Sequence, residues 1–327
     1  MKYNAYLVEE NDGIYNGSIQ EIDMQPIEPK NLIIKVHYSS LNYKDALAAS
    51  GVKGVASSYP FVPGIDVAGE VIESSSDIYN VGDKVIATGY KIGMKVFGGF
   101  GELVQLPAEW VLPLPENLSF KDAMSLGTAG LTAGACIKRI IDAGIPNNMP
   151  IIVSGSTGGV GSVAVNLLSK LNYDVHAITG KPDEKKILIK MGANEIIDRE
   201  EYMQDPIKPL DTGMYAGGVD TVGGDLLAKM LSMITNHGAV SCCGNVAGMK
   251  FTSSVFPFIL RGISLIGIDS AESPLAFKQD IWNLFANDWS LDLDEYTRIL
   301  SLSEIDNEIS RILKGKQVGR VVIKHEV

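Results

Sequence analysis

The chain has 327 residues, of which 46% are hydrophobic and 20% are charged, and its formal net charge is −11. This balance is typical of a globular protein of about two domains, and the acidic charge argues against a large nucleic-acid or anionic-membrane surface. The three cysteines have no metal-binding or disulfide spacing, no uncharged apolar run is long enough to span a bilayer, and the first residues lack a secretory core. We therefore expect a cytoplasmic protein with a small-molecule substrate, and neither a nucleic acid nor a membrane as its partner.

Short strands are predicted in the first third of the chain. Runs of strand-forming residues lie at 32–38, 67–72, 81–86, 102–106 and 110–114, and Gly, Pro and Asp turns separate them. This pattern predicts a small barrel or sandwich, which we assign to residues 1–123. A last strand at 319–324 is expected to return to this domain, so that residues 271–327 complete it.

Strands alternate with helices from about residue 124 onward. Strand candidates lie at 151–153, 175–178, 195–197, 219–222, 239–242 and 264–268, and helical spacing occurs at 160–171, 183–191 and 226–234. This alternation predicts a parallel, doubly wound sheet, and six strands complete the Rossmann arrangement. The predicted fold class is therefore α/β, with a Rossmann domain at residues 124–270.

A glycine-rich loop at residues 154–161, with the sequence SGSTGGVG, is the sharpest motif. It follows an apolar strand and opens an amphipathic helix, which is the context of a dinucleotide-binding loop. Glycines let the backbone approach a pyrophosphate, and the amides and dipole of the helix N-terminus favour its negative charge. A merely tight strand-to-helix turn is the alternative interpretation.

The end of the second Rossmann strand indicates the cofactor. An NAD-selective fold usually places an acid there, whereas this strand ends in Thr179 and Lys181, a hydroxyl and a cation that suit a phosphate. Asp183 and Glu184 lie close by and are the argument for NAD. Pro182, however, predicts the first position of a helix, where acids are favoured by the dipole. We therefore predict NADPH as the cofactor.

No metal site is predicted. A catalytic zinc needs Cys, His or carboxylate ligands brought together, and residues 1–123 contain no cysteine and only one histidine, His37. A mixed site of histidine and carboxylates stays open as an alternative, but no spacing favours it.

Over nearly its whole length the chain resembles the medium-chain dehydrogenase/reductases. More narrowly, it resembles the zinc-free quinone oxidoreductase group and its YhdH/YhfP-type branch, which includes acrylyl-CoA reductase. The matching segments are residues 39–47, 62–66, 127–133, 154–161, 179–181, 256–262, 267–270 and 319–320. The resemblance implies a GroES-like β-barrel for the first domain. It also implies metal-free chemistry, because Asn42 stands at or beside the position where zinc-using relatives have a cysteine.

The resemblance further implies which residues bind the cofactor. These are Tyr43 at the nicotinamide end, Thr157, Gly158, Gly159 and Val160 at the pyrophosphate, Thr179, Gly180 and Lys181 at the 2′-phosphate, Arg199 as a further contact, and Asn245, Ile259 and Ser270 on the nicotinamide and ribose side. The family usually has Ser and Arg where this chain has Thr179 and Lys181. Lysine keeps the charge but loses the planar fork, so we expect fewer directed hydrogen bonds to the phosphate.

Candidate catalytic residues follow from the charge that develops during reduction of an enone or enoyl thioester. Hydride addition creates an enolate oxygen, and a donor placed there lowers the barrier. Tyr43 is the first candidate donor and Asn42 the second, while water is the candidate proton source. Structural alternatives are a core role for Tyr43 or Ile259 and a helix-capping role for Asp45, which we favour.

Three functions stay open at this point. They are an NADPH-dependent reductase of activated alkenes, with acrylyl-CoA as the most specific candidate, a quinone reductase with the same cofactor, and a non-catalytic NADPH-binding protein. The last Rossmann strand is apolar and carries no Lys or Pro, which predicts an edge paired across a two-fold axis. We expect a homodimer centred near Ile266, and we expect proline at Ile266 to remove a donor that this pairing needs.

Overall fold

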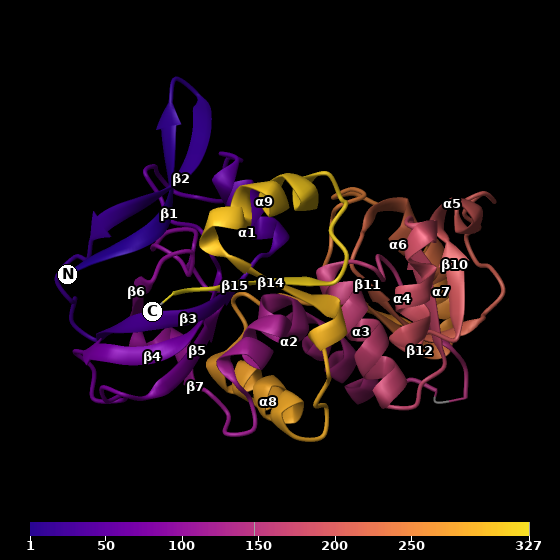
Figure 1. Cartoon of the computed structure of the whole chain (residues 1–327). Coiled ribbons are helices and arrows are strands. Elements are labelled where there is room, and N and C mark those ends of the chain that lie inside the picture. The colour runs from indigo at the N-terminus through magenta and orange to yellow at the C-terminus, as the bar shows by residue number, and fades with distance from the viewer. Residues whose placement is uncertain (147, 327) are drawn as a thin grey trace. The chain divides into compact units, whose positions relative to one another are not determined.

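The computed structural model describes residues 1–146 and 148–326 (Figure 1). The chain folds as two compact units. Unit 1 consists of Met1–Thr128 together with Ala271–Val327, and unit 2 is the continuous segment Ala129–Ser270. Each unit has its own sheet and its own apolar core.

The strands of unit 1 pair mainly antiparallel, with one parallel pair at Thr297–Ser301 and Arg320–Lys324. Its described part contains a seven-stranded sheet in the order β14 (Thr297–Ser301), β15 (Arg320–Lys324), β3 (Asn31–Ser40), β4 (Asp66–Ser74), β5 (Lys84–Thr88) and β7 (Val111–Pro113), with β6 (Leu103–Pro107) paired to β3. The last strand of the chain thus lies antiparallel to β3, where Val322 faces Ser40. Most residues of β3, β4, β5 and β15 are buried, and apolar side chains of the first three of these strands form a core of unit 1.

Unit 1 begins with a hairpin that the sequence analysis did not predict. Strands β1 (Lys2–Asn11) and β2 (Ile14–Asp23) pair antiparallel. The turn between them is Asp12-Gly13, and both residues have positive φ, 52° and 79°. An Asp-Gly pair between alternating runs is a strong hairpin signal, because this turn requires positive φ at both positions.

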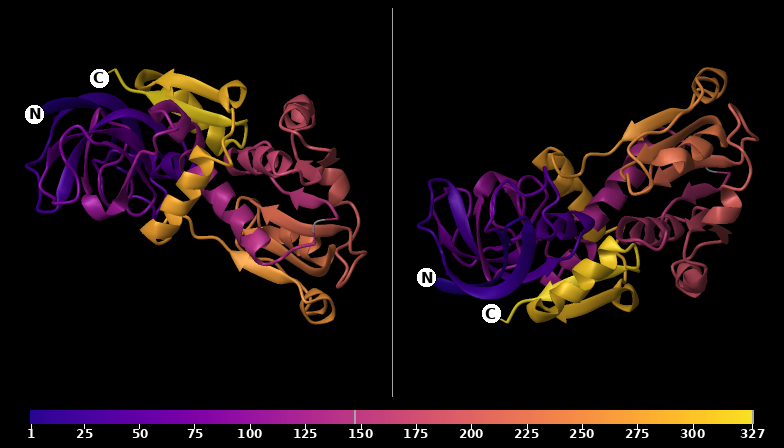
Figure 2. Two further views of the ribbon diagram at one scale, coloured as in Figure 1. Left: turned by 90° about the horizontal axis from the view of Figure 1, so that it is seen from below. Right: turned by 90° about the horizontal axis from the view of Figure 1, so that it is seen from above.

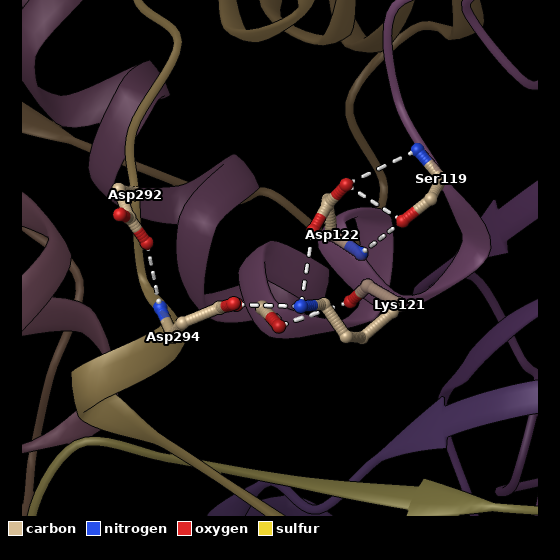
Figure 3. Close-up of polar contacts among 6 residues, drawn as sticks. Ser119, Lys121, Asp122, Asp292 and Asp294 are labelled. Carbon is tan, nitrogen blue, oxygen red and sulfur yellow. Dashed lines mark hydrogen bonds and ion pairs between the residues drawn. The ribbon is translucent and has the colours of Figure 1, made fainter.

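The helices of unit 1 are α1 (Tyr43–Ala49), the first part of α2 (Phe120–Asp142), α8 (Leu275–Ala286) and α9 (Ile305–Leu313), with short 3₁₀ turns at Ala108–Trp110, Asp294–Tyr296 and Leu302–Glu304. Polar contacts fix the start of α2 (Figure 3). The hydroxyl of Ser119 donates to the Asp122 carboxylate at 2.6 Å, and the ammonium group of Lys121 lies 2.6 Å from a carboxylate oxygen of Asp294. These contacts join α2 to the returning C-terminal segment.

Unit 2 has the Rossmann strand order. Within its described residues the sheet has six strands in the order β10 (Glu195–Asp198), β9 (Val175–Thr179), β8 (Ile151–Val153), β11 (Tyr215–Asp220), β12 (Ile234–Cys242) and β13 (Ser264–Gly267). All neighbours are parallel. Helices flank the sheet (Figure 2), namely α3 (Gly159–Lys170), α4 (Lys185–Lys190), α5 (Arg199–Tyr202), α6 (Gly224–Ser232) and α7 (Phe256–Arg261). The predicted α/β fold class is confirmed.

Two details of unit 2 differ from the sequence expectation. The helix expected at 226–234 is α6, which ends at Ser232, and Ile234 already begins β12. The helix expected at 183–191 is split into a 3₁₀ turn at Pro182–Glu184 and α4. Pro182 occupies the first position of that turn, with Asp183 and Glu184 in its first turn, as predicted.

Helix α2 changes direction at Gly127, where φ is 52° and ψ is −154°. A β-carbon there would lie 2.5 Å from the Ser40 hydroxyl oxygen and 2.6 Å from an Asp66 carboxylate oxygen. Only glycine fits this close approach. The expected boundary at residues 123 and 124 lies inside α2, and the units divide between Thr128 and Ala129. Among the described residues, no helix is long and apolar enough to cross a membrane.

Candidate functional site

The glycine-rich loop of unit 2 connects β8 to α3. The amide of Ser156 donates to the Ile178 carbonyl at 3.1 Å, and the amide of Gly158 donates to the Gly155 carbonyl at 2.9 Å. Helix α3 then begins at Gly159 with Gly158 as its N-cap residue. The first amides of a helix have no partner within the helix, so this end of α3 is suited to an anion.

The end of β9 lies directly beside this loop. The hydroxyl oxygens of Thr157 and Thr179 are 3.4 Å apart, and both residues are buried. The Thr179 hydroxyl also accepts a hydrogen bond from the amide of Lys181 at 3.0 Å. Thr179 therefore fixes the backbone of Lys181 next to the glycine loop.

The guanidinium group of Arg199 packs over Gly180. A β-carbon at Gly180 would lie 2.9 Å from the central carbon of this group, so a side chain at this position would displace the guanidinium. Arg199 is exposed and begins α5, directly after β10. The structure thus brings Thr157, the Thr179–Lys181 segment and Arg199 together, although they come from three strand ends. The segment thus offers a lysine next to a residue that contacts a guanidinium group, and both kinds of cation suit a phosphate.

A cavity of about 340 Å³ opens beside Arg199. Its lining includes Arg199, Met203, Val222, Leu226 and Lys250. Val222 follows the carboxyl end of β11, and ligands of doubly wound sheets bind at that edge. The sequence reasoning missed Val222 and Lys250, and the one available signal was the position of Val222 after a strand.

Asp220 braces the sheet at the point where the strand order reverses. Its carboxylate accepts hydrogen bonds from the Ser154 hydroxyl at 2.7 Å and from the Gly223 amide at 2.9 Å. Thr221 in turn donates its hydroxyl hydrogen to the Ser154 carbonyl at 2.8 Å. Burial raises the pKa of Asp220, and the hydrogen bonds from Ser154 and Gly223 oppose that rise. These contacts tie β8 to β11, so they fix the first residue of the glycine loop.

Three further predicted cofactor residues lie elsewhere in unit 2. Asn245 is exposed in the turn after β12, where its carbonyl accepts from the Gly248 amide at 3.1 Å. The hydroxyl groups of Ser270 and Thr132 are 2.6 Å apart. Ile259 lies on α7 and is 68% exposed, so the core alternative for Ile259 is wrong.

In unit 1, the candidate residues Asn42 and Tyr43 stand at the start of α1. Asn42 is the N-cap residue, and its backbone amide donates to the Asp45 carboxylate at 2.8 Å. The other oxygen of Asp45 accepts from the Ile65 amide at 2.8 Å. The capping role of Asp45 is confirmed. Burial, together with the nearby charge of Asp66, raises the pKa of Asp45 to about 7.

The side chain of Asn42 belongs to a buried polar cluster. Its side-chain NH₂ group donates to the Asp66 carboxylate at 2.7 Å and to the Ser40 carbonyl at 3.4 Å. Its side-chain oxygen accepts from the Arg320 guanidinium at 3.4 Å. Asp66 also accepts from the hydroxyl of Thr128 at 2.5 Å. Both amide hydrogens of Asn42 are therefore used inside the protein. Sequence reasoning missed Asp66 and Arg320, because the contact between Arg320 and Asn42 spans 278 positions.

Tyr43 differs from Asn42 in its surroundings. Its side chain is 41% exposed, so the core alternative for Tyr43 is wrong. Asn42 is 9% exposed. Of the two candidate donors, Tyr43 is the one that a ligand at the surface of unit 1 can reach.

Comparison with known proteins agrees with this arrangement. The profile of the alcohol dehydrogenase GroES-like domain matches residues 28–116, and that of the zinc-binding dehydrogenases matches residues 159–287. The chain is 38% identical to the acrylyl-CoA reductase AcuI of Ruegeria pomeroyi, covering 98% of both chains. It is equally similar, at 38% identity over 98% of both chains, to a Bacillus subtilis protein named "Putative quinone oxidoreductase YhfP". The chain belongs to the YhdH/YhfP branch of the medium-chain dehydrogenase/reductases.

Solved structures of this branch match the whole fold. The yhdH oxidoreductase of Salmonella enterica in complex with NADP is 35% identical, covers 100% of both chains and has a TM-score of 0.95. The Bacillus subtilis protein yhfP with NAD bound is 38% identical, with a TM-score of 0.96 over 99% of this chain and 100% of that one. The branch therefore includes structures with each of the two nicotinamide cofactors.

The chain matches the profile of the zinc-binding dehydrogenases, but the residues at Asn42 do not fit a zinc ion. The guanidinium group of Arg320, which is 2% exposed, donates into the cluster where a cation would sit. Asp66 is already occupied by hydrogen bonds from Ser40, Asn42 and Thr128. Over residues 1–146 and 148–326, no three His, Cys, Asp or Glu side chains come together as a ligand set.

Proposed function

We propose that this protein is an NADPH-dependent reductase of an activated alkene, with an enoyl thioester such as acrylyl-CoA as the favoured substrate. The observation that carries the cofactor choice is the packing of Arg199 over Gly180 beside Lys181, because two cations suit a 2′-phosphate. The substrate choice rests on the similarity to the acrylyl-CoA reductase of Ruegeria pomeroyi. A quinone reductase is the second candidate, and the similarity to YhfP favours it.

We assign the following cofactor contacts. The pyrophosphate is bound at the N-terminus of α3 by Thr157, Gly158, Gly159 and Val160, and the 2′-phosphate by Thr179, Gly180, Lys181 and Arg199. The Thr179 hydroxyl accepts a hydrogen bond from the Lys181 amide and retains its own hydrogen, which it donates to the phosphate in this assignment. Asn245, Ile259 and Ser270 are assigned to the ribose and nicotinamide side on the basis of the family resemblance.

Bound NADPH supplies the hydride that adds to the β-carbon of the alkene. Negative charge then develops on the carbonyl oxygen of the substrate, and a hydrogen-bond donor at that oxygen stabilises it. We assign this role to the hydroxyl of Tyr43. Asn42 acts as a positioning residue, since its amide group is engaged by Asp66 and Ser40 and holds the start of α1 in place. A proton from water completes the reaction at the α-carbon.

The proposed reaction requires no metal, since the Arg320 guanidinium fills the polar cluster at Asn42. We expect turnover to survive exhaustive chelation, and elemental analysis of the purified protein to find no stoichiometric zinc. One tightly bound zinc per chain, whose removal abolishes turnover, is the result that contradicts metal-free catalysis.

The function is tested by following NADPH oxidation with acrylyl-CoA and with a simple quinone side by side. Faster turnover of acrylyl-CoA supports the alkene reductase, and turnover of the quinone alone supports the second candidate. Tight NADPH binding without turnover of either substrate favours a non-catalytic binding protein. Replacing Tyr43 with Phe, which removes only the hydroxyl, is expected to lower kcat by about tenfold to a thousandfold.

We also propose that the protein is a homodimer paired through β13. This strand is at the edge of the described sheet of unit 2. The neighbouring segment carries apolar side chains that are exposed in the isolated chain, including Met249 at 87%, Val255 and Ile259. An apolar edge of this kind is usually covered or paired.

A further inference from the structure

Two segments of unit 1 carry lysines and no acidic residue. Residues 46–65 contain Lys53, and residues 84–101 contain Lys84, Lys91 and Lys95, whereas the whole chain has 39 Asp and Glu residues and a net charge of −11. The acids that flank the first segment, Asp45 and Asp66, are fully buried. Clusters of one sign on a protein of the opposite sign attract oppositely charged ligands.

The structure places these two segments side by side. The amide of Ser57 donates to the Met94 carbonyl at 2.9 Å. The rings of Phe61 and Phe97 pack edge to face with centroids 5.6 Å apart. The amide of Gly98 donates to the Val62 carbonyl at 2.8 Å. The segments therefore form one surface of unit 1.

Helix α1 connects this surface to the proposed catalytic tyrosine. The hydroxyl of Tyr59 donates to the Ala48 carbonyl at 2.6 Å, which ties the first segment to the C-terminal end of α1. Tyr43 stands at the opposite end of the same helix. Seven residues of helix span about 10 Å, so a ligand that reaches from Tyr43 to this surface must carry a long arm.

Lys53 and Lys95 of this surface, and Lys44 beside Tyr43 at the start of α1, are available to a ligand. Within residues 1–146 and 148–326, the side chains of Lys44, Lys53 and Lys95 have no hydrogen-bond or ion-pair partner. Lys91 differs, since it pairs with Glu272. The apolar side chains of Val52 and Phe97 are exposed on the same segments.

We propose that Lys44, Lys53 and Lys95, with Val52 and Phe97, bind the phosphates and adenine of the CoA moiety of the thioester substrate. Lysine ammonium groups are flexible point charges that bind phosphates without a fixed geometry. An exposed aromatic ring offers a face for the adenine. This inference rests on the proposed reduction of a thioester, and it names the part of the protein that recognises the CoA moiety of that substrate.

The experiment compares two substrates that differ only beyond the pantetheine arm. NADPH oxidation is followed with acrylyl-CoA and with acryloyl-pantetheine, which lacks the nucleotide and its phosphates. In the variant Lys53→Ala/Lys95→Ala, we expect the KM for acrylyl-CoA to rise about five- to tenfold. The KM for acryloyl-pantetheine and both kcat values are expected to stay as in the wild type. The control Lys170→Ala/Lys314→Ala removes two exposed lysines from other parts of the chain.

The results separate the assignment of the lysines from the proposed function. An equal rise of KM for both thioesters, or no rise beyond that of the control variant, overturns the assignment of the lysines while leaving the thioester reductase intact. If the wild type reduces neither thioester, the proposed function fails. Titration of free CoA into NADP-saturated protein then decides the surface independently, because saturation blocks the nucleotide site of unit 2. Weaker CoA binding by Lys53→Ala/Lys95→Ala supports the surface, and equal or absent binding overturns it.

Discussion

At the scale of single residues, the proposed 2′-phosphate site combines two cations of different shape. The family resemblance implies an arginine at the position of Lys181. In this chain the guanidinium group of Arg199 packs over Gly180, the residue before that lysine. Lys181 lacks the planar, forked donor geometry of a guanidinium group, and Arg199 has it. The missing acid at the end of β9 removes the repulsion that an NAD-selective site exerts on this phosphate.

Lys181 is the residue whose loss tests the cofactor choice. We expect Lys181→Ala to weaken NADPH binding by about 1.5–3 kcal/mol more than NADH binding, because only NADPH carries the 2′-phosphate. Titration of both cofactors against the wild type and the variant measures the difference. Lys170→Ala serves as the control for loss of an exposed lysine in unit 2. Equal losses for the two cofactors contradict the assignment.

His325 is a buried titratable residue outside the proposed site. It is 4% exposed, its Nε2 atom lies 3.2 Å from the Ser39 hydroxyl oxygen, and burial lowers its pKa to about 4. The unfolded chain binds this proton near pH 6.5, so it holds more protons than the folded protein between pH 6.5 and 4. The stability contributed by neutral His325 is therefore present above pH 6.5 and is lost as the pH falls, by up to about 3 kcal/mol.

The test compares the pH dependence of the free energy of unfolding in the wild type and in His325→Gln. The variant is expected to lose less stability between pH 6.5 and 4, because it has no imidazole to protonate. Asp45 titrates in the opposite sense, since its raised pKa stabilises the fold at low pH, so the difference between the two proteins is the quantity to measure. His237→Asn, at an exposed position, is the control. Parallel curves contradict the role of His325.

At the scale of elements, short-range sequence patterns predicted the helices, strands and turns that short-range interactions determine. The glycine loop, the six strands of unit 2 and the proline-initiated turn at Pro182 follow from short-range spacing, and the structure has all of them. The β1–β2 hairpin was missed although its Asp12-Gly13 turn was visible in the sequence. Ile234 was assigned to a helix because its spacing fits one, but pairing with β11 draws it into a strand.

The edge strand β13 leads to a corrected test of the dimer. The amide of Ile268 donates to the Cys242 carbonyl of β12. Since successive amides of a strand alternate in direction, the amide of Ile266 also faces β12, and the amides of Leu265 and Gly267 face the open edge. Proline at Ile266 would break the sheet of unit 2 itself, so the sequence-based choice of Ile266 was wrong.

Gly267 is the suitable position. A β-carbon there has no atom within 4 Å, and proline at this position removes one outward-facing amide. Light scattering at micromolar concentration is expected to find a dimer for the wild type and for Gly267→Ala, which keeps the amide, and a monomer for Gly267→Pro. A monomeric wild type with full activity contradicts the dimer.

At the scale of the whole molecule, the residues that the sequence did not reveal are those held by distant contacts. Thr157, Thr179 and Lys181 could be named from motifs, whereas the Asp66–Arg320 cluster joins both ends of unit 1. Burial of two carboxylates, Asp45 and Asp66, requires the nearby positive charge of Arg320. Such a requirement becomes visible only when the fold brings the strands together.

The discontinuity of unit 1 has a consequence during synthesis on the ribosome. Unit 2 is one continuous segment, so it emerges complete and can fold while the rest of the chain is still being made. Unit 1 must wait for β15, which pairs with β3 and delivers Arg320 to carboxylates that have no other buried cation beside them in the described cluster. We expect nascent chains stalled before residue 320 to hold a protease-resistant unit 2 and a protease-sensitive unit 1. Synthesis of residues 320–324 thus decides when β3 and its neighbours complete their fold.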